Sequence, residues 1–270
     1  MPTIDVSGVT LSYEASGRGE PVLLLTGTGA RGRSWALHQV PALTSGGLRA
    51  YTMDNRGSGD SGPAVPGLTV ADLVADTVAV VERAVGGPCA FVGTSMGALV
   101  VQELLLVRPD LATRAVLMAS RARPDPMSTA LNNAERELGE SGVALPPRYA
   151  AVVRALQNLS PATLADPELS QDWLDLFEFS PEDGASPGAL AQLGVQLTTD
   201  RRGAYARVRT PVHVISFADD LIAPPRHGRE LAAAIPGATY AEIPDAGHYG
   251  YLEQPDAVNA ELLRFLGRRA

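Results

Sequence analysis

The chain contains no lysine, because all 22 basic residues among its 270 are arginine. This absence excludes a Schiff-base lysine, a serine–lysine dyad and the lysine of a phosphate-binding P-loop. Cysteine is almost absent as well, and Cys89 is the only one. A disulfide within the chain therefore cannot form, and the apolar neighbours of Cys89 predict a buried structural thiol. Four scattered histidines and one cysteine form no ligand cluster, so we expect neither a metal site nor a cofactor.

Charged residues and long apolar runs are scarce too. Charged residues make up 19% of the chain, and its formal net charge of -8 argues against nucleic acid and anionic membranes as partners. No apolar run approaches the ~18 residues that span a bilayer, and residues 1–17 lack the charged start and apolar core of a signal peptide. We therefore expect a cytoplasmic protein. Its length and its 45% of hydrophobic residues suit one large α/β domain, or one domain that carries an insertion.

Apolar segments and helical patterns alternate along most of the sequence. Residues 3–16 alternate around a turn at Ser7-Gly8, which predicts an antiparallel hairpin. Further strands are expected at 22–25, 48–53, 89–92, 114–119, 212–215 and 239–243. The expected helices cover 35–43 with Ser34 as N-cap, 70–85 with Thr69 as N-cap, 98–106, 229–235 and 255–266. This alternation implies a mostly parallel sheet with helices on both faces.

A serine stands between one of these strands and the helix that follows it. The apolar run 89–92 leads into Gly93-Thr94-Ser95-Met96-Gly97, and residues 98–106 are good helix formers. In this context the G-x-S-x-G motif indicates a nucleophile elbow, in which a sharp turn presents the serine hydroxyl above the sheet. Such a turn strains the backbone of Ser95, and glycines on both sides avoid collisions with neighbouring elements. Without a strand and a helix around it, a glycine-flanked serine is more often a plain turn or a helix N-cap.

Two further sequence features supply partners for Ser95. Serine is a poor nucleophile until a base takes its proton, and histidine does this best when a carboxylate orients it. An aspartate pair, Asp219 and Asp220, follows one of the late strands, and His248 ends the loop Asp-Ala-Gly-His just past the last strand. The chain thus offers serine, aspartate and histidine in that order. His213 lies inside a strand, and we interpret it as a core or interface residue.

These features, together with the turn Asp54-Asn55-Arg56-Gly57-Ser58-Gly59-Asp60-Ser61, resemble the α/β-hydrolase family, in which this turn reads D-x-R-G-x-G-x-S. The resemblance covers nearly the whole chain and is weakest between 124 and 201. It implies an α/β-hydrolase fold, which is a mostly parallel eight-stranded sheet flanked by helices, with a helical cap insertion. It also implies that Ser95 is the nucleophile and that His248 acts as general base and then as general acid.

The resemblance favours Asp220 over Asp219 as the residue that orients His248. In the family pattern the acid stands four residues before a proline, as Asp220 does before Pro224. Adjacent residues near a strand end also tend to point in opposite directions, so only one of the two carboxylates faces the histidine comfortably. We interpret Asp219 as a solvated or turn-capping residue.

An oxyanion that develops on the substrate needs two preorganised N–H donors. The resemblance assigns one to the backbone of Met96 and the other to Thr28, in the loop Thr26-Gly27-Thr28-Gly29, where many relatives carry His-Gly. Because these donors are backbone groups, the hole can survive a change of side chain. Gly27 and Gly29 are expected to line the substrate site, and the glycine-rich loop leaves room for a bulkier substrate.

From residue 124 to 201, prolines and short helical segments replace the strands. The helical segments cover 131–138, 148–159, 169–177 and 189–197. Because this stretch leaves the end of one strand and returns to the next, it fits a cap over the site. The predicted division is a core of 1–123 and 202–270 and a helical cap of 124–201. Aromatic residues are only 5% of the chain, yet several fall in the cap, where internal packing and substrate contact are both open. The candidates for substrate contact are Tyr149, Trp173 and Phe177.

The function that these residues predict is cleavage of a carboxylic ester or thioester by a cofactor-free serine hydrolase, through an acyl-enzyme on Ser95. The expected partner is a small-molecule ester or thioester, either free or bound to a carrier protein. Three alternatives stay open. They are a thioesterase or acyltransferase of specialised metabolism that acts on a carrier-bound acyl group, a C–C bond hydrolase, and a ligand-binding receptor that retains the triad. The sequence carries no signal for the oligomeric state.

Overall fold

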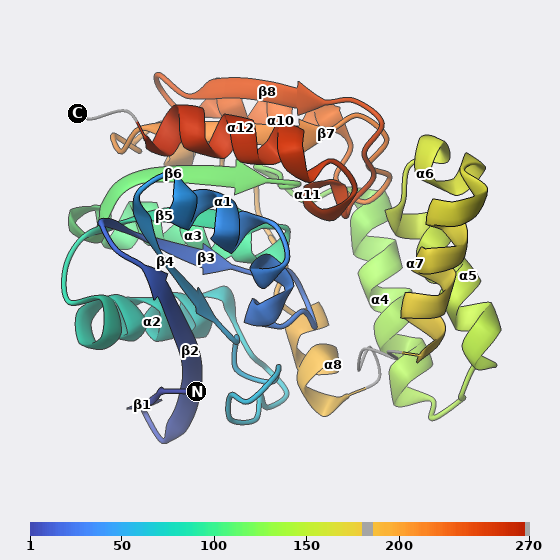
Figure 1. The fold of residues 1–270 in the computed structure, drawn as a ribbon. Helices are drawn as coiled ribbons and strands as arrows, with labels where there is room; N and C mark the ends of the chain where they lie inside the picture. The colour runs from blue at the N-terminus through green and yellow to red at the C-terminus, as the bar shows by residue number, and fades with distance from the viewer. Residues whose placement is uncertain (180–185, 268–270) are drawn as a thin grey trace.

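The computed structural model describes residues 1–179 and 186–267, and its centre is an eight-stranded sheet (Figure 1). The strands are β1 Thr3–Val6, β2 Val9–Gly17, β3 Glu20–Leu25, β4 Leu48–Met53, β5 Cys89–Thr94, β6 Ala112–Met118, β7 Val212–Phe217 and β8 Thr239–Ile243. Their order across the sheet is β1-β2-β4-β3-β5-β6-β7-β8. Only β2 runs antiparallel to its neighbours, so the predicted mostly parallel sheet is confirmed. Residues 180–185 of the predicted cap and 268–270 of the predicted core lie outside the described residues.

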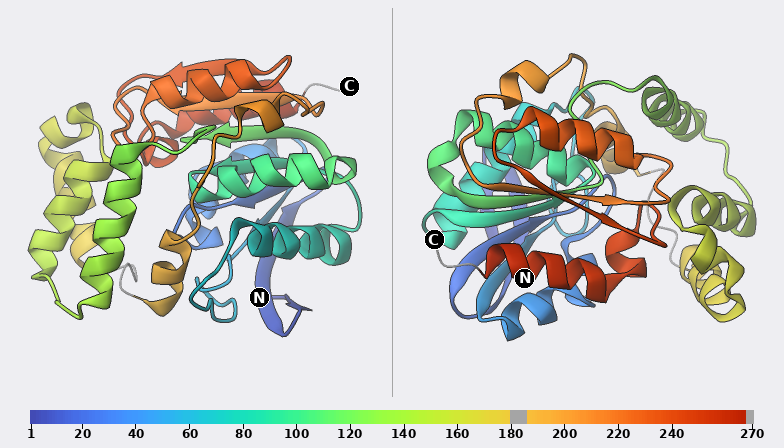
Figure 2. Two further views of the ribbon diagram at one scale, coloured as in Figure 1. Left: turned by 180° about the vertical axis from the view of Figure 1, so that it is seen from behind. Right: turned by 90° about the horizontal axis from the view of Figure 1, so that it is seen from above.

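Helices cover both faces of this sheet, and each face has its own apolar core (Figures 1 and 2). On one face lie α2 (Val70–Val80), α3 (Met96–Val107) and α10 (Pro225–Ala234). On the other face lie α1 (Gln39–Ser45) and α12 (Pro255–Leu266). All residues of β5 and β7 are buried, as expected of strands covered on both sides. Cys89 is buried at the start of β5, and this burial raises the pKa of its thiol to about 12.

The first hairpin turn and the two ends of α2 follow from local sequence signals. Ser7 and Gly8 both have positive φ, 49° and 82°, which is the turn geometry that closes a two-residue hairpin between β1 and β2. Thr69 is the N-cap of α2, and Asp72 completes a capping box with it. A π-helical turn, η2 (Val81–Val85), extends α2 and is followed by Gly86, which has a φ of 87°. The predicted hairpin and the predicted helix 70–85 are therefore confirmed.

The predicted helix 35–43 is wrong. The structure has a short 3-10 helix, η1 (Gly32–Ala36), and then α1, and Ser34 is not the N-cap of either. Proline lacks an N–H and clashes with the preceding turn inside a helix, but it fits the first turn. A helix that began at residue 35 would hold Pro41 in its interior, whereas α1 starts at Gln39 and accommodates Pro41 in its first turn.

Five helices lie within the described residues of the predicted cap, 124–201. They are α4 (Pro126–Glu140), α5 (Pro147–Asn158), α6 (Pro161–Ala165), α7 (Pro167–Phe179) and α8 (Pro187–Leu193). Each begins with a proline, because a proline at the first helical position loses no hydrogen bond and already has a helical φ. The prediction put the starts of these helices too late and omitted α6, since it treated the prolines as breaks. It also ran the last helix to 197, although α8 ends before Gly194.

These helices lie beyond the carboxyl ends of the parallel strands, where α4 to α7 form a separate layer beside the sheet (Figures 1 and 2). The two ends of the stretch meet, because the backbone N–H of Arg201 donates to the carbonyl of Ala122 at 2.9 Å. A short helix, α9 (Arg202–Tyr205), then leads back to β7. Within the described ranges, no helix has the length and apolar character needed to cross a membrane.

Candidate active site

Ser95 lies on the turn between β5 and α3, with a φ of 52° and a ψ of -119°. A positive φ is costly for a residue with a side chain, and the neighbouring glycines leave room for it. A Cβ on Gly93 would lie 2.6 Å from the carbonyl oxygen of Gly97, and a Cβ on Gly97 would collide with the carbonyl oxygen of Leu25. The turn therefore has the geometry that the motif predicts, and the Ser95 side chain is partly exposed.

Ser95, His248 and Asp220 are joined by two hydrogen bonds. His248 Nε2 lies 3.1 Å from Ser95 Oγ, and His248 Nδ1 lies 2.8 Å from Asp220 Oδ2. The two partners of the serine are buried, at 8% and 2% exposed, so little water competes for these bonds. When Nδ1–H donates to the carboxylate, Nε2 is left to accept the serine proton. The three side chains that the sequence singled out thus form one hydrogen-bonded chain.

Of the two adjacent aspartates, Asp220 is the one that bonds to His248. Its second oxygen, Oδ1, accepts the backbone N–H groups of Ile222 and Ala223, both at 2.8 Å, so the carboxylate is fixed by its own loop. Asp219 has a different contact, because its backbone N–H donates to the carbonyl of Ala246 at 2.9 Å. Asp219 therefore ties the loop after β7 to the loop that carries His248.

The glycine-rich loop after β3 lies against Ser95. A Cβ on Gly27 would stand 3.2 Å from Ser95 Cβ and 3.7 Å from Ser95 Oγ. Two N–H groups of the loop are already used, since Ala30 donates to the carbonyl of Gly27 at 3.3 Å and Gly29 donates to a side chain of α8 at 2.8 Å. The N–H of Thr28 has no acceptor among the described residues. The N–H of Met96, the first residue of α3, likewise lacks an intrahelical acceptor.

The turn 54–61 is hydrogen-bonded to both ends of this loop. Asp54 Oδ1 accepts the N–H of Gly32 at 2.7 Å, and Oδ2 accepts the N–H of Asp60 at 2.9 Å. Asn55 Nδ2 donates to the carbonyl of Thr26 at 3.3 Å. The turn that resembles the family pattern is therefore a structural brace, and its polar groups hold both ends of the glycine-rich loop.

Two of the three aromatic residues predicted to contact substrate lie beside the histidine loop. Phe177 and Trp173, both on α7, pack against each other at 5.3 Å between ring centroids, and each lies about 6 Å from the ring of Tyr249. Tyr249 directly follows His248, and Arg154 of α5 donates to its hydroxyl at 3.0 Å. Tyr149 is not part of this cluster, and its side chain is 57% exposed.

Further contacts join the segment at the end of α5 to the histidine loop, and no local sequence pattern indicates them. Glu253 Oε2 accepts the N–H of Gly247 at 2.7 Å, while Oε1 accepts the N–H of Ser160 at 2.8 Å. The backbone N–H of Tyr249 donates to the carbonyl of Asn158 at 3.1 Å. The carboxylate and the carbonyl thus fix the backbone on both sides of His248.

Glu135 is a second residue that the sequence did not single out. It lies on the same face of α4 as Ser128, whose hydroxyl donates to the carbonyl of Ile222 at 2.8 Å, and as Gly139, where a Cβ would collide with Leu190 of α8. Glu135 therefore faces the space between the aspartate loop and α8. Burial raises the pKa of its carboxyl, and attraction to His248 opposes this shift. No cation pairs with it among the described residues.

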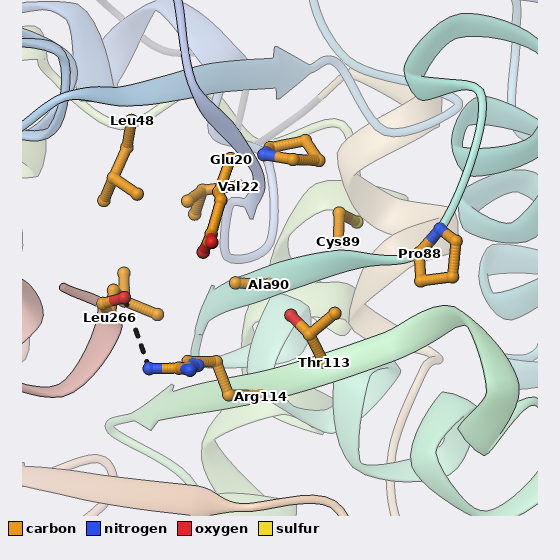
Figure 3. Close-up of a pocket in the computed structure, with 10 residues that line it drawn as sticks. Glu20, Val22, Leu48, Pro88, Cys89, Ala90, Thr113, Arg114 and Leu266 are labelled. Carbon is orange, nitrogen blue, oxygen red and sulfur yellow. Dashed lines mark hydrogen bonds between the residues drawn. The ribbon is translucent and has the colours of Figure 1, made fainter. Parts of the chain in front are cut away.

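Two cavities lie at opposite ends of the sheet. A cavity of about 240 Å³ lies between α4, α5 and the loop after Asp220, with walls that include Met127, Leu131, Leu156 and Ile222. The other cavity, of about 260 Å³, lies at the amino ends of β3 to β6 (Figure 3). In the latter, Arg114 Nη1 donates to the carbonyls of Phe265 and Leu266 at the end of α12, at 2.9 and 3.3 Å. Only the apolar cavity lies at the end of the sheet where Ser95 is found.

His213, the histidine inside a strand, forms structural contacts. His213 is fully buried in β7, with Nδ1 2.8 Å from Thr239 Oγ1 and Nε2 3.1 Å from Glu261 Oε2, and burial lowers its pKa. This placement agrees with its interpretation as a core residue. In the part of the chain that the structure describes, no three His, Cys, Asp or Glu side chains meet in a group that could hold a metal ion.

Comparisons with known proteins identify the family of the chain. The sequence profile described as "Alpha/beta hydrolase family" matches residues 22–261. The protein named "Putative non-heme bromoperoxidase BpoC" from Mycobacterium tuberculosis is 46% identical over 257 residues, which cover 95% of this chain and 97% of that protein. The crystal structure of BpoC matches with a TM-score of 0.92 at 45% identity, over 95% of both chains.

Two more distant relatives carry the names of hydrolases. The protein named "Putative carbamate hydrolase RutD" from Pseudomonas syringae is 28% identical over 252 residues, which cover 91% of this chain and 93% of that one. The crystal structure of the enol-lactonase from Burkholderia xenovorans matches with a TM-score of 0.87 at 25% identity, over 99% and 100% of the two chains. The profile and the 46% identity to BpoC show that the chain belongs to the α/β-hydrolase family.

Proposed function

We propose that the protein is a cofactor-independent serine hydrolase that cleaves a carboxylic ester or thioester through an acyl-enzyme on Ser95. The observation that carries this proposal is the hydrogen-bonded chain from Ser95 through His248 to Asp220, at 3.1 and 2.8 Å. A serine with this pair of partners on an elbow turn is arranged for acyl transfer. Names of relatives such as carbamate hydrolase and enol-lactonase support hydrolysis of a carbonyl compound.

The chemistry takes place in two steps. Ser95 Oγ attacks the carbonyl carbon while His248 Nε2 takes the hydroxyl proton, and the resulting oxyanion is held by the N–H groups of Met96 and Thr28. His248 then gives its proton to the departing alcohol or thiol, which leaves an ester on Ser95. In the second step a water molecule loses its proton to His248 and attacks this ester, and release of the carboxylic acid restores Ser95. Asp220 keeps the imidazole oriented throughout.

A thioesterase or acyltransferase would use the same acyl-enzyme with a thiol or a second alcohol, a C–C hydrolase would use a carbon leaving group, and a receptor would bind without turnover.

The name of the relative BpoC favours a second candidate function, peroxide-dependent bromination. Hydrogen peroxide that replaces water in the second step would attack the acyl-enzyme and release a peroxyacid. The peroxyacid oxidises bromide to hypobromous acid and is itself reduced to the carboxylic acid, so the balance requires an acyl donor as well as peroxide. This activity would therefore depend on Ser95 and on an ester or acid that can acylate it.

The test is a panel of aryl esters and acyl thioesters of increasing chain length, followed by stopped-flow measurement of the released chromophore. An acyl-enzyme predicts an initial burst that is stoichiometric with the enzyme, followed by a slower steady state. The same panel with peroxide and bromide separates the two candidates. A protein that turns over no member of the panel, yet melts at a higher temperature with one of them, would be a receptor and would contradict the proposal.

A further inference from the structure

Helix α8 packs closely on the loop that carries Thr28. Its Gly188 touches the turn 54–61 backbone to backbone, since a Cβ on Gly57 would stand 2.8 Å from Gly188 Cα. Its Ala189 touches the loop itself, since a Cβ on Gly29 would stand 3.7 Å from Ala189 Cβ. Both core glycines have positive φ, 88° at Gly57 and 70° at Gly29, a backbone form that favours glycine. The approach of α8 to the core is therefore close and specific.

One side chain of α8, Gln192, bonds to the loop and to the turn at once. It is fully buried, at 0% exposed. Its Oε1 accepts the N–H of Gly29 at 2.8 Å, and its Nε2 donates to the carbonyl of Arg56 at 2.8 Å and to Ser58 Oγ at 2.9 Å. A primary amide offers an acceptor and two donors on one rigid plane, so all three bonds depend on one side-chain orientation. The residue joins three segments that are far apart in the sequence.

Gln192 bonds to the middle of the loop, at Gly29, whereas Asn55 and Asp54 bond to its two ends. Asn55 holds Thr26 at the start of the loop, and Asp54 holds Gly32 at its end. Among the described residues, the bond from Gly29 to Gln192 is the only side-chain hydrogen bond to the backbone N–H groups of 27–30.

Gln192 thereby fixes the plane of the Thr28–Gly29 peptide. The N–H of Thr28 belongs to the preceding peptide unit, whose carbonyl, that of Gly27, accepts the N–H of Ala30 at 3.3 Å. Since the two units meet at the Cα of Thr28, the bond to Gln192 restricts the direction of the Thr28 N–H from one side and the bond from Ala30 restricts it from the other.

We propose that Gln192 is a positioning residue, which holds the loop 27–30 from the cap so that the N–H of Thr28 faces the oxyanion formed above Ser95. This inference rests on the proposed function, because it assigns Thr28 to the oxyanion hole. Gln192 itself does not touch the reacting atoms. Its loss is expected to leave substrate binding intact and to weaken stabilisation of the transition state, which lowers kcat more than it changes KM.

The experiment compares Gln192→Met with Gln196→Met in the full-length protein, using an aryl ester that the wild type hydrolyses. Methionine keeps the length of glutamine but removes all three hydrogen bonds. Gln196 is a matched control, because within 1–179 and 186–267 its amide bonds only to the nearby carbonyl of Leu193, at 3.0 Å. Removal of a whole oxyanion donor costs about 10²–10³ in kcat, so we expect displacement of one donor to cost on the order of 10–10². KM should stay unchanged, and Gln196→Met should behave as the wild type.

Two further measurements keep the result decisive. Ser58→Ala removes one of the bonds that orient Gln192 and should lower kcat by a smaller factor, even if Gln192→Met folds poorly. Hydrogen exchange at the N–H of Gly29, followed by NMR, should be faster in Gln192→Met or Ser58→Ala than in the wild type. A folded Gln192→Met with unchanged kcat, or with a lower melting temperature as its only defect, would overturn the inference. If the wild type hydrolyses no ester, the proposed function fails, and unchanged exchange at Gly29 would then overturn the positioning role separately.

Discussion

The sheet with its flanking helices, called the core here, and the helices α4 to α8, called the cap here, contribute to this site in different ways. The core loops supply the side chains that would react, with Ser95 after β5, Asp220 after β7 and His248 after β8. The helices of the cap supply none of these three, yet they bond to the glycine-rich loop and to the loops that carry Asp220 and His248. Gln192 holds the glycine-rich loop, and the carbonyl of Asn158 holds the histidine loop. Substitutions of the reacting side chains in the core should therefore have the largest effect on the rate of the chemical step. Substitutions in the cap should change how accurately the core loops are positioned and which substrates are preferred.

The largest difference is expected within the core, between the two aspartates. Asp220→Asn should lower kcat by up to ~10⁴, because the amide no longer stabilises the imidazolium or fixes its tautomer. Asp219→Asn should cost far less, since Asp219 contacts Ala246 through its backbone, which the change leaves in place. The measurement is kcat for both variants, with the melting temperature as a check on folding. The reverse order at unchanged melting temperature would show that the hydrogen bond at 2.8 Å does not define the orienting acid.

A smaller and different effect is expected from the aromatic cluster of the cap. Trp173→Ala and Phe177→Leu alter the packing around Tyr249, next to His248, and should shift the ratio of kcat/KM between short and long acyl chains by about tenfold. Leucine is chosen at Phe177 because an alanine there would leave a cavity in the buried cap cluster. Reaction of Ser95 with a phosphonate should persist in both variants.

The control for this prediction is Phe179→Ala, on the same helix. Phe179 is 79% exposed, so its removal should change neither the preference nor the melting temperature. If Trp173→Ala and Phe177→Leu lowered only stability and left the chain-length preference unchanged, the cluster would serve only internal packing of the cap. The cap would then have no part in substrate preference.

The smallest expected effect concerns Glu135 and the stability of the cap. Burial raises the pKa of Glu135 in the folded protein, so the folded state holds this proton to higher pH than the unfolded chain does. Stability is therefore lost as pH rises above the ordinary range of a glutamate. Glu135→Gln should melt at the same temperature as the wild type near pH 4 and on the order of 1 °C higher at pH 7.5.

Its matched control is Glu137→Gln, an exposed carboxylate two residues along the same helix. The melting temperature of Glu137→Gln, relative to that of the wild type, should not rise between pH 4 and pH 7.5. A gain from Glu135→Gln that was equal at both pH values would show that ionisation of this carboxyl does not destabilise the cap.

The parts of the molecule that local patterns determine could be predicted from the sequence. The alternation of apolar segments predicted the strands, Thr69 predicted the start of α2, and glycines around Ser95 predicted a turn whose crowding the structure displays. The failures also have local causes. Because Pro41 fits the first turn of a helix and not its interior, α1 begins later than predicted. The prolines of the cap stand at the first position of the helices, before the predicted starts.

The contacts that hold the site could not be predicted in this way. Gln192 bonds to Gly29 across 163 positions of sequence, and Ser160 donates to Glu253 across 93. Neither Gln192 nor Glu253 belongs to a motif, and a glutamine or glutamate on a short helix is most often solvated. Their roles arise only when the chain between β6 and β7 folds back onto the carboxyl ends of the strands.

Labelling with an active-site phosphonate tests whether Ser95 is the sole nucleophile. Trypsin should release the site within residues 84–114, because Arg108 precedes Pro109 and is not cleaved, and Ser95 is the only serine of that peptide. Intact mass spectrometry of the wild type should show one adduct, and the digest should place it on this peptide. Ser95→Ala should remain unlabelled while keeping the melting temperature of the wild type. An adduct that persists in Ser95→Ala, or one that maps to another peptide, would contradict the assignment of Ser95 as the sole nucleophile.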